Sequence, residues 1–151
     1  YMTKTRRMIE ADVKLVDAVC EILDARIPLA SRNPDIDRLA GDKPRIVVLN
    51  RTDLADPKAT ARWRAAFQRQ GMTVLETDSR SGKGVNGFAG AVRTALREAL
   101  LSEASVEVLL AYADTENGAQ DADVLRLALQ LLPARSPRRA GLVARLEQLE
   151  R

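Results

Sequence analysis

Three apolar runs of strand length, each followed by polar residues, constrain the fold of this chain more than any other feature. They are Val16–Leu23, Arg45–Leu49 and Thr73–Glu76. Short apolar runs bounded by polar or turn residues are typical of strands that are buried on both faces of a parallel sheet. We therefore expect three strands here, the first of them covered on both of its faces.

The residues between the second and third runs have the pattern of a helix. Asp56 offers an N-cap and Pro57 a first-turn proline, and Gly71 stands where such a helix would end. Trp63 and Phe67 lie one helical turn apart in between. Strand, helix and strand in this order form a parallel βαβ unit. The expected fold class is therefore α/β, with a parallel sheet flanked by helices.

Two further helices are expected on either side of this unit. Thr3–Lys14 has the composition of a short polar helix, and Val85–Leu101 has that of a longer one. Phe88, Val92 and Leu96 recur four residues apart in the second of these. That spacing places them on one face of a helix.

The last fifty residues differ in pattern from the rest. Val106–Ala111 has the composition of a strand, whereas Asp123–Leu132 and Ala140–Arg151 have the periodicity of amphipathic helices. We therefore expect two parts, a sheet-forming segment of residues 1–101 and a C-terminal strand and helical segment of residues 102–151.

Composition excludes several kinds of site. The 151 residues contain one cysteine and no histidine, so neither a disulfide framework nor the usual zinc clusters can form. No apolar run approaches 18 residues and no signal-peptide pattern is present, so we expect a cytoplasmic protein with no membrane contact. Only five residues are aromatic, which disfavours a stacking platform for single-stranded nucleic acid. No feature points to DNA.

Arginine supplies most of the positive charge in a chain of net charge +3. Clusters occur at residues 6–7, at residue 135 and at residues 138–139. Such clusters are consistent with contacts to phosphate or RNA. The alternative is a solvated, arginine-rich surface, and the sequence leaves both interpretations open.

A polar loop, Asn50-Arg51-Thr52-Asp53, directly follows the second apolar run, where open α/β sheets bind ligands. The Asp53 carboxylate could accept both the ring N–H and the exocyclic amine of guanine, a donor pair that adenine lacks. Each such bond is worth roughly 1.5–3 kcal/mol. Asn50 would join the base to neighbouring loops, and the stem of Arg51 would cover the base plane. The alternative is an ordinary Asx turn that leads into a capped helix.

The loop after the third run, Thr77–Val85, is expected at the same edge of the sheet. Ser79 and Arg80 hold the positions from which a backbone N–H could contact the guanine carbonyl. Lys83 does not belong to a P-loop, because GxxxxGK[ST] needs a glycine at position 77 and a serine or threonine at position 84. No other stretch fits that pattern, and no aspartate is followed by glycine three residues later.

Several blocks resemble the N-terminal half of the circularly permuted YlqF/RbgA-type GTPases. The resemblance runs from about Met2 to Leu101, and its most specific block is Asp24–Pro34. It implies a partial, permuted P-loop GTPase-like domain in which base recognition comes first. It also implies GTP or GDP as ligand, Mg²⁺ as cofactor, and a role in large ribosomal subunit assembly with rRNA and ribosomal proteins as partners. Because the chain has neither a P-loop nor Mg²⁺ ligands, we expect a truncated form that does not hydrolyse GTP alone.

The family's site residues can be carried over by position. Asn50, Arg51 and Asp53 match its guanine motif, and Ser79 matches its second base loop, with Arg80 beside it. A further set belongs to the most specific block, and its members either contact the ligand or pin their own loops: Asp24, Arg26, Arg32 and Asn33. No residue of this chain is expected to be catalytic or to bind a metal.

Three functional hypotheses remain open at this point. The first is a guanine-nucleotide binding protein of the ribosome-assembly GTPases. The second is a non-catalytic module, or a truncated pseudo-GTPase, that contacts ribosomal RNA or protein through its arginines. The third is a helical interaction protein whose C-terminal leucines face a partner, against the alternative that these leucines pack on the sheet. The leucines concerned are Leu125, Leu129, Leu142, Leu146 and Leu149.

Overall fold

The computed structural model describes residues 2–103 and 105–151. Tyr1 and Ala104, which fall within the two predicted segments, lie outside the described residues. The chain divides into two compact units, Tyr1–Leu96 and Arg97–Arg151, and the division falls within helix α5. Each unit is described by itself.

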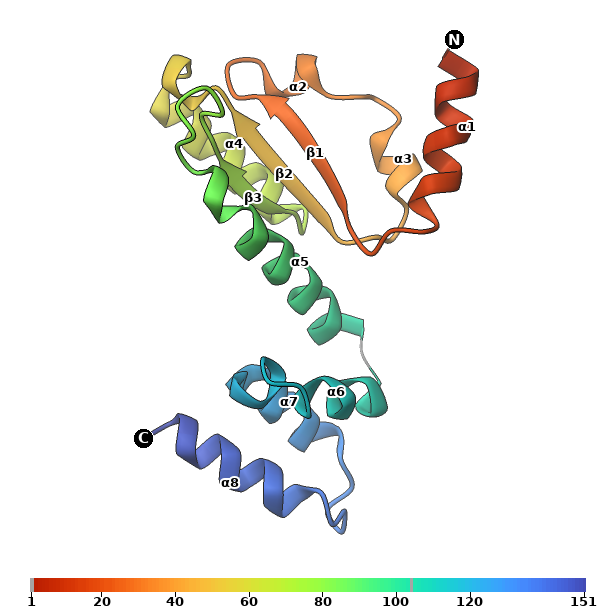
Figure 1. Cartoon of the computed structure of the whole chain (residues 1–151), viewed down its shortest axis with the longest axis vertical. Helices are drawn as coiled ribbons and strands as arrows, with labels where there is room; N and C mark the ends of the chain where they lie inside the picture. The colour runs from red at the N-terminus through yellow and green to blue at the C-terminus, as the bar shows by residue number, and fades with distance from the viewer. Residues whose placement is uncertain (1, 104) are drawn as a thin grey trace. The chain divides into compact units, whose positions relative to one another are not determined.

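The first unit is built on a parallel sheet of three strands (Figure 1). The strands are β1 (Val19–Asp24), β2 (Arg45–Asn50) and β3 (Thr73–Glu76), and they lie side by side in that order. Asp24 is the register partner of Asn50 at the carboxyl end of the sheet. This arrangement confirms the predicted α/β fold with a parallel sheet.

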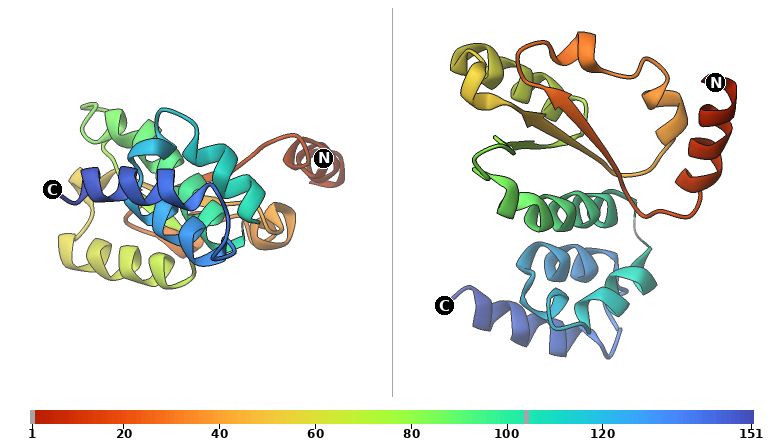
Figure 2. Two further views of the ribbon diagram at one scale, coloured as in Figure 1. Left: turned by 90° about the horizontal axis from the view of Figure 1, so that it is seen from below. Right: turned by 45° about the horizontal axis from the view of Figure 1, so that its top comes forward.

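Helices cover the two faces of β2 (Figure 2). Side chains alternate along a strand, so one half of β2 faces each helix. Val47 and Leu49 pack with Phe67 of α4 (Pro57–Arg69), whose predicted Asp56 cap and first-turn proline are confirmed. On the opposite face, Ile46 and Val48 pack with Ala91 and Ala95 of α5 (Phe88–Glu103).

The prediction that β1 is covered on both faces was wrong. Ile22 is 69% exposed and Cys20 is also exposed, whereas Leu23 is buried. The exposed pair lies on the same face of the sheet as Ile46 and Val48, which α5 covers at β2 but not at β1. An apolar run therefore predicted the strand but not its position at the edge of the sheet.

Helix α5 contacts the sheet mainly through small residues. Phe88 and Leu96 are 43% and 38% exposed, and the residues in contact with the sheet are Ala91, Val92 and Ala95. Small side chains let the helix approach the β2 side chains closely, so the alanines rather than the largest residues form the contact.

Shorter elements complete the first unit. The helix α1 (Met2–Val13) agrees with the one predicted from Thr3 to Lys14 and contacts α3 (Ile36–Ala40). The remaining elements are α2 (Pro28–Ser31) and the one-turn helices η1 (Thr52–Leu54) and η2 (Val85–Gly87).

The second unit is helical. It contains α6 (Val106–Ala113), η3 (Gly118–Gln120), α7 (Ala122–Leu131) and α8 (Arg139–Leu149). The strand predicted over Val106–Ala111 was wrong, because the Ser105 hydroxyl accepts a hydrogen bond from the Val108 N–H and so caps a helix.

The C-terminal leucines mostly pack against one another within this unit. Leu125 and Leu142 are buried, and Leu129 and Leu146 pack against them, whereas Leu149 is 41% exposed. Their core lies between α6, α7 and α8 rather than on the sheet. In the described part of the chain, no helix is long and apolar enough to span a membrane.

Candidate functional site

The loops that follow the three strands are joined to one another at the carboxyl edge of the sheet. The Ala25 N–H donates to the Asn50 carbonyl at 2.8 Å, which ties the loop after β1 to the end of β2. On the other side, the Thr77 N–H donates to the Leu49 carbonyl at 2.9 Å, and the Thr52 N–H donates to the Thr77 carbonyl at 3.2 Å. The edge is therefore continuous from the first strand to the third.

Asn50 connects the second loop to the third through one side-chain oxygen. Its Oδ1 accepts hydrogen bonds from the Thr77 hydroxyl at 3.0 Å, the Ser79 N–H at 3.0 Å and the Ser79 hydroxyl at 2.9 Å. An Asx turn would instead direct this oxygen to the backbone two residues further along its own loop. Asn50 thus holds Ser79 against the end of β2, as predicted for a residue that joins neighbouring loops.

Asp53 lies in η1, three residues beyond Asn50, and it is exposed. The turn that brings it there needs Arg51 in the left-handed region, with φ of 63°. The cap of α4 is Asp56, whose carboxylate accepts from the Ala59 N–H at 3.0 Å, and not Asp53. Among residues 2–103 and 105–151, the Asp53 carboxylate accepts no hydrogen bond.

Asp78 shapes the loop after β3. Its backbone N–H donates to the Lys83 carbonyl at 2.9 Å, and its carboxylate accepts from the Arg80 N–H at 3.1 Å and from the Ser81 hydroxyl. The hydrogen bond from Ser81 is the main reason why the pKa of Asp78 is lowered. Gly84 then closes the loop at φ +80°, and a Cβ there would stand 2.3 Å from the Glu76 carbonyl oxygen. The loop therefore has a fixed conformation, with Ser79 and Arg80 at its tip.

Arg26 and Asp24 form a side-on pair in the loop after β1. The Arg26 Nε donates to both Asp24 carboxylate oxygens at 2.9 and 3.2 Å, and Nη2 donates at 2.6 Å. These bonds hold the pKa of Asp24 well below its usual range and raise that of Arg26. The charge of Asp53 contributes to the rise in the Arg26 pKa, and the charge of Arg51 contributes to the fall in the Asp24 pKa.

Three relatives share a stretch of this chain. The sequence is 43% identical over 98 residues to ribosome biogenesis GTPase A of Priestia megaterium. The matched stretch covers 65% of this chain and 34% of that protein. Over this stretch, the chain is homologous to ribosome biogenesis GTPase A. It is also 32% identical over 110 residues to Short integuments 2, mitochondrial, of Arabidopsis thaliana, covering 73% and 28% of the two chains. Mitochondrial ribosome-associated GTPase 1 of Bos taurus is 38% identical over 72 residues, covering 48% and 22%.

The chain thus spans about a third of the length of ribosome biogenesis GTPase A. A family model described as "YTH3-like protein, third C-terminal helical domain" matches residues 105–151, which hold α6, α7 and α8. The two kinds of match therefore cover different parts of the chain. Ribosome biogenesis GTPase A matches 65% of it, and the helical family model matches its C-terminal third.

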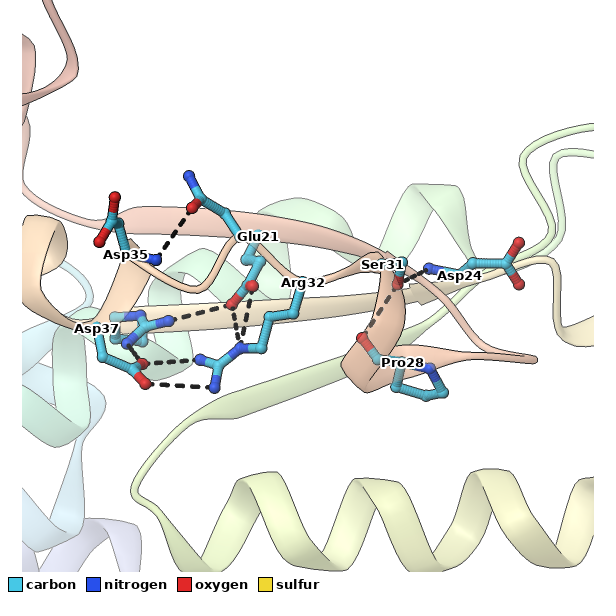
Figure 3. Close-up of polar contacts among 9 residues, drawn as sticks. Glu21, Asp24, Pro28, Ser31, Arg32, Asp35 and Asp37 are labelled. Carbon is cyan, nitrogen blue, oxygen red and sulfur yellow. Dashed lines mark hydrogen bonds and ion pairs between the residues drawn. The ribbon is translucent and has the colours of Figure 1, made fainter. Parts of the chain in front are cut away.

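The residues of the Asp24–Pro34 block lie in two different places in the structure. Asp24 and Arg26 lie at the carboxyl edge, whereas Arg32 lies beside the middle of β1 (Figure 3). The Asn33 side chain accepts from the Asp35 N–H at 3.0 Å, so its oxygen serves its own loop. Only the first half of the block therefore lies with Asn50, Asp53 and Ser79.

Arg32 belongs to a cluster of two arginines and two carboxylates, in which Asp37 is exposed and the other three side chains are largely buried (Figure 3). Arg32 Nε lies 3.1 Å from Glu21 and its Nη2 lies 2.8 Å from Asp37, while Arg45 bridges the same two carboxylates at 3.1 and 2.7 Å. The Arg32 guanidinium also stacks 5.6 Å from the centre of the Phe67 ring. The cluster fastens the α2–α3 segment to the sheet.

Sequence reasoning missed three residues that organise the site and its support. Thr77 and Asp78 shape the third loop, and Glu21 is buried in the middle of β1. The Asp-Ser-Arg order at residues 78–80 is an Asx-turn signal that could have pointed to Asp78. No local pattern distinguishes Glu21, since its partners lie 11 and 24 residues away.

Several of the clustered arginines have partners within the chain. Arg6 pairs with Glu10 at 3.5 Å, and Arg138 donates to Asp114 at 2.8 Å. The Arg139 Nη1 donates to the carbonyls of Leu129 and Leu132 at the end of α7. These arginines therefore have structural partners, which supports the interpretation as an ordinary arginine-rich surface.

One cavity of the first unit lies away from the strand-end loops. A cavity of about 680 Å³ lies between α1 and α3, with Glu10, Arg38 and Lys43 among its lining residues. Within the described ranges, no group of three or more histidine, cysteine, aspartate or glutamate residues could hold a metal ion.

Proposed function

We propose that this chain is a guanine-nucleotide binding protein that acts in ribosome biogenesis, with the base held at the carboxyl edge of the sheet. One observation carries the proposal. Asn50 fixes Ser79 beside the second loop, and no described residue donates a hydrogen bond to the exposed Asp53 carboxylate. A carboxylate in that state can accept both donors of a guanine edge, each bond being worth roughly 1.5–3 kcal/mol.

The expected roles follow from the three loops. Asp53 selects guanine over adenine, the stem of Arg51 covers one plane of the base, and a backbone N–H of Ser79 or Arg80 donates to the guanine carbonyl. GTP and GDP are therefore the expected ligands. A role in ribosome biogenesis is in keeping with the names of its bacterial relatives. We further propose that the protein acts in the cytoplasm and on the large ribosomal subunit.

Hydrolysis by this chain alone is not expected. Phosphoryl transfer requires groups that cradle the phosphates and a positioned Mg²⁺, and the sequence contains no P-loop pattern. We propose that the base-recognition loops belong to a circularly permuted GTPase domain, as the resemblance to the YlqF/RbgA-type GTPases implies. Nucleotide affinity should be weak, because phosphate contacts usually supply most of it.

The test is a titration of the full chain with GMP, XMP and AMP, followed by backbone amide chemical shifts in NMR. We expect GMP to bind at least about tenfold more tightly than AMP, the equivalent of about 1.4 kcal/mol. Asp53→Asn should move the preference toward XMP, because the new amide can donate to the xanthine oxygen. Asp42→Asn, which removes the same charge from an exposed turn before β2, is the matched control. Equal affinity for all three nucleotides would refute the proposal.

A further inference from the structure

The Asp24 carboxylate binds the guanidinium of Arg26, and the neighbouring strand-end loop carries a second carboxylate, Asp53. Asp24 takes it side-on through Nε and Nη2 and also accepts from the Arg26 backbone N–H at 3.0 Å. The charge of the second carboxylate, Asp53, contributes to the raised pKa of Arg26, although no hydrogen bond joins the two side chains. The exposed Arg26 is thus paired with Asp24 and not with Asp53.

The backbone explains why the two carboxylates are neighbours. Asp24 and Asn50 are register partners at the ends of adjacent parallel strands, and the Ala25 N–H donates to the Asn50 carbonyl. Asp53 follows Asn50 after a single tight turn, whose first residue is Arg51. The loops after β1 and β2 therefore leave the sheet side by side, and Arg26 is the second residue after β1.

An arginine placed on Asp53 would disable it as a base acceptor. Side-on pairs between arginine and a carboxylate occupy both carboxylate oxygens, and these are the atoms that a guanine edge would need. Asp24 prevents this pairing because it lies only two residues from Arg26 and fixes both its side chain and its backbone.

We infer that Asp24 is a positioning residue that holds Arg26 away from Asp53 and so keeps the Asp53 carboxylate free for a guanine base. The inference rests on the proposed function, since it assigns Asp24 a part in the same site. Asp24 itself need not touch the nucleotide. Its effect on binding passes through Arg26, and removal of Arg26 should therefore cancel it.

The experiment repeats the GMP and AMP titrations on the full chain with Asp24→Asn, Arg26→Gln and the double variant. Asp24→Asn should weaken GMP binding about tenfold, as expected for loss of one charge-assisted hydrogen bond, because the released Arg26 pairs with Asp53. Arg26→Gln should leave GMP binding within about twofold of the wild type. The double variant should return close to that value, and Asp42→Asn serves as the control for charge.

A lysine at position 26 gives a second test that leaves Asp24 intact. Lysine keeps the charge but cannot form the side-on pair with Asp24, so it is held less firmly. We expect Arg26→Lys to bind GMP more weakly than Arg26→Gln does. A purely structural role of Arg26 predicts the opposite order, since lysine would preserve more of the ion pair.

The outcomes separate this inference from the proposed function. If the wild type prefers GMP over AMP but Asp24→Asn binds GMP equally well, the inference is wrong and the proposed function stands. A loss in Asp24→Asn that Arg26→Gln fails to restore also overturns it, because Asp24 would then act directly. If the wild type shows no preference for GMP, the proposed function itself fails. Should Asp24→Asn not fold, the order of the two Arg26 variants decides.

Discussion

Two arginines six residues apart, Arg26 and Arg32, belong to one sequence block and have different environments. The Arg32 side chain is 13% exposed, and it contacts two carboxylates and an aromatic ring. The Arg26 side chain is 41% exposed and contacts one carboxylate in its own loop. Both form close ion pairs, so the presence of a pair does not reveal the role of either residue.

Arg32 and Arg26 differ in how deeply they are buried and in how far along the sequence their partners lie. The Glu21 side chain, 7% exposed, is taken out of water, and a buried charge that loses its partner is costly. The exposed pair of Arg26 is surrounded by water, where an ion pair contributes about 0–1 kcal/mol. We therefore assign Arg32 to the stability of the fold and Arg26 to the behaviour of the site.

The largest effect is expected for Glu21→Gln. This substitution keeps the shape of the side chain but leaves the largely buried Arg32 and Arg45 with the exposed Asp37 as their remaining carboxylate. The free energy of unfolding of the first unit should fall by about 3 kcal/mol. Urea titration followed by the fluorescence of Trp63, the only tryptophan, would measure it. A loss below about 1 kcal/mol would contradict the assignment of the cluster to stability.

Arg32→Lys should have the next largest effect. Lysine retains the charge but cannot contact Glu21 and Asp37 side-on, and it loses the planar stacking on Phe67. We expect a loss of about 1–2 kcal/mol in the free energy of unfolding, measured in the same urea titration. Arg38→Lys, at an exposed pair with Glu10, is the matched control and should change little.

Acid should weaken the cluster in a way that Asp37 controls. Hydrogen bonding from Arg45, with help from Arg32, lowers the pKa of Asp37 in the folded protein. A lowered folded pKa stabilises the fold above the unfolded value of about 4, and this stabilisation is lost as the pH falls through the folded value. Stability should therefore decline below about pH 4, and less steeply in Asp37→Asn. Equal slopes in both proteins would argue against this contribution.

The smallest effect on stability is expected for Arg26→Gln. The pair with Asp24 is exposed, so the free energy of unfolding should change by no more than about 0.5 kcal/mol. Thermal melting of the variant beside the wild type is sufficient to test this. A loss as large as that of Arg32→Lys would remove the distinction between the two arginines.

Local patterns were sufficient for the layout of the first unit. Apolar runs located all three strands, and the Asp56-Pro57 pair located the start of α4, because strand burial and helix capping depend on neighbouring residues. The edge position of β1 was not predictable, because the exposure of Ile22 depends on how far α5 extends across the sheet. The helix over Val106–Ala113 was missed because an apolar run of that length fits either structure.

The sequence predicted those site residues that lie together in one strand-end loop. It predicted less well the contacts between residues of different segments. The order of residues 50–53 pointed to the second loop, and the link from Asn50 to Ser79 agrees with that expectation. The separation of Arg26 from Arg32 was not predictable, because Arg32 finds Glu21 through a turn that returns the chain to the middle of β1. Long-range partners of this kind leave no local signal.

Gly84 sets a limit on how the specificity of the third loop could be redesigned. Since any side chain at this position would collide with the end of β3, the loop must close through glycine whatever its tip contains. Exchanges at Ser79 and Arg80 are compatible with this closure, because both residues are exposed. A library that varies residues 79 and 80 and leaves 84 unchanged would therefore alter the recognition surface without altering the path of the backbone.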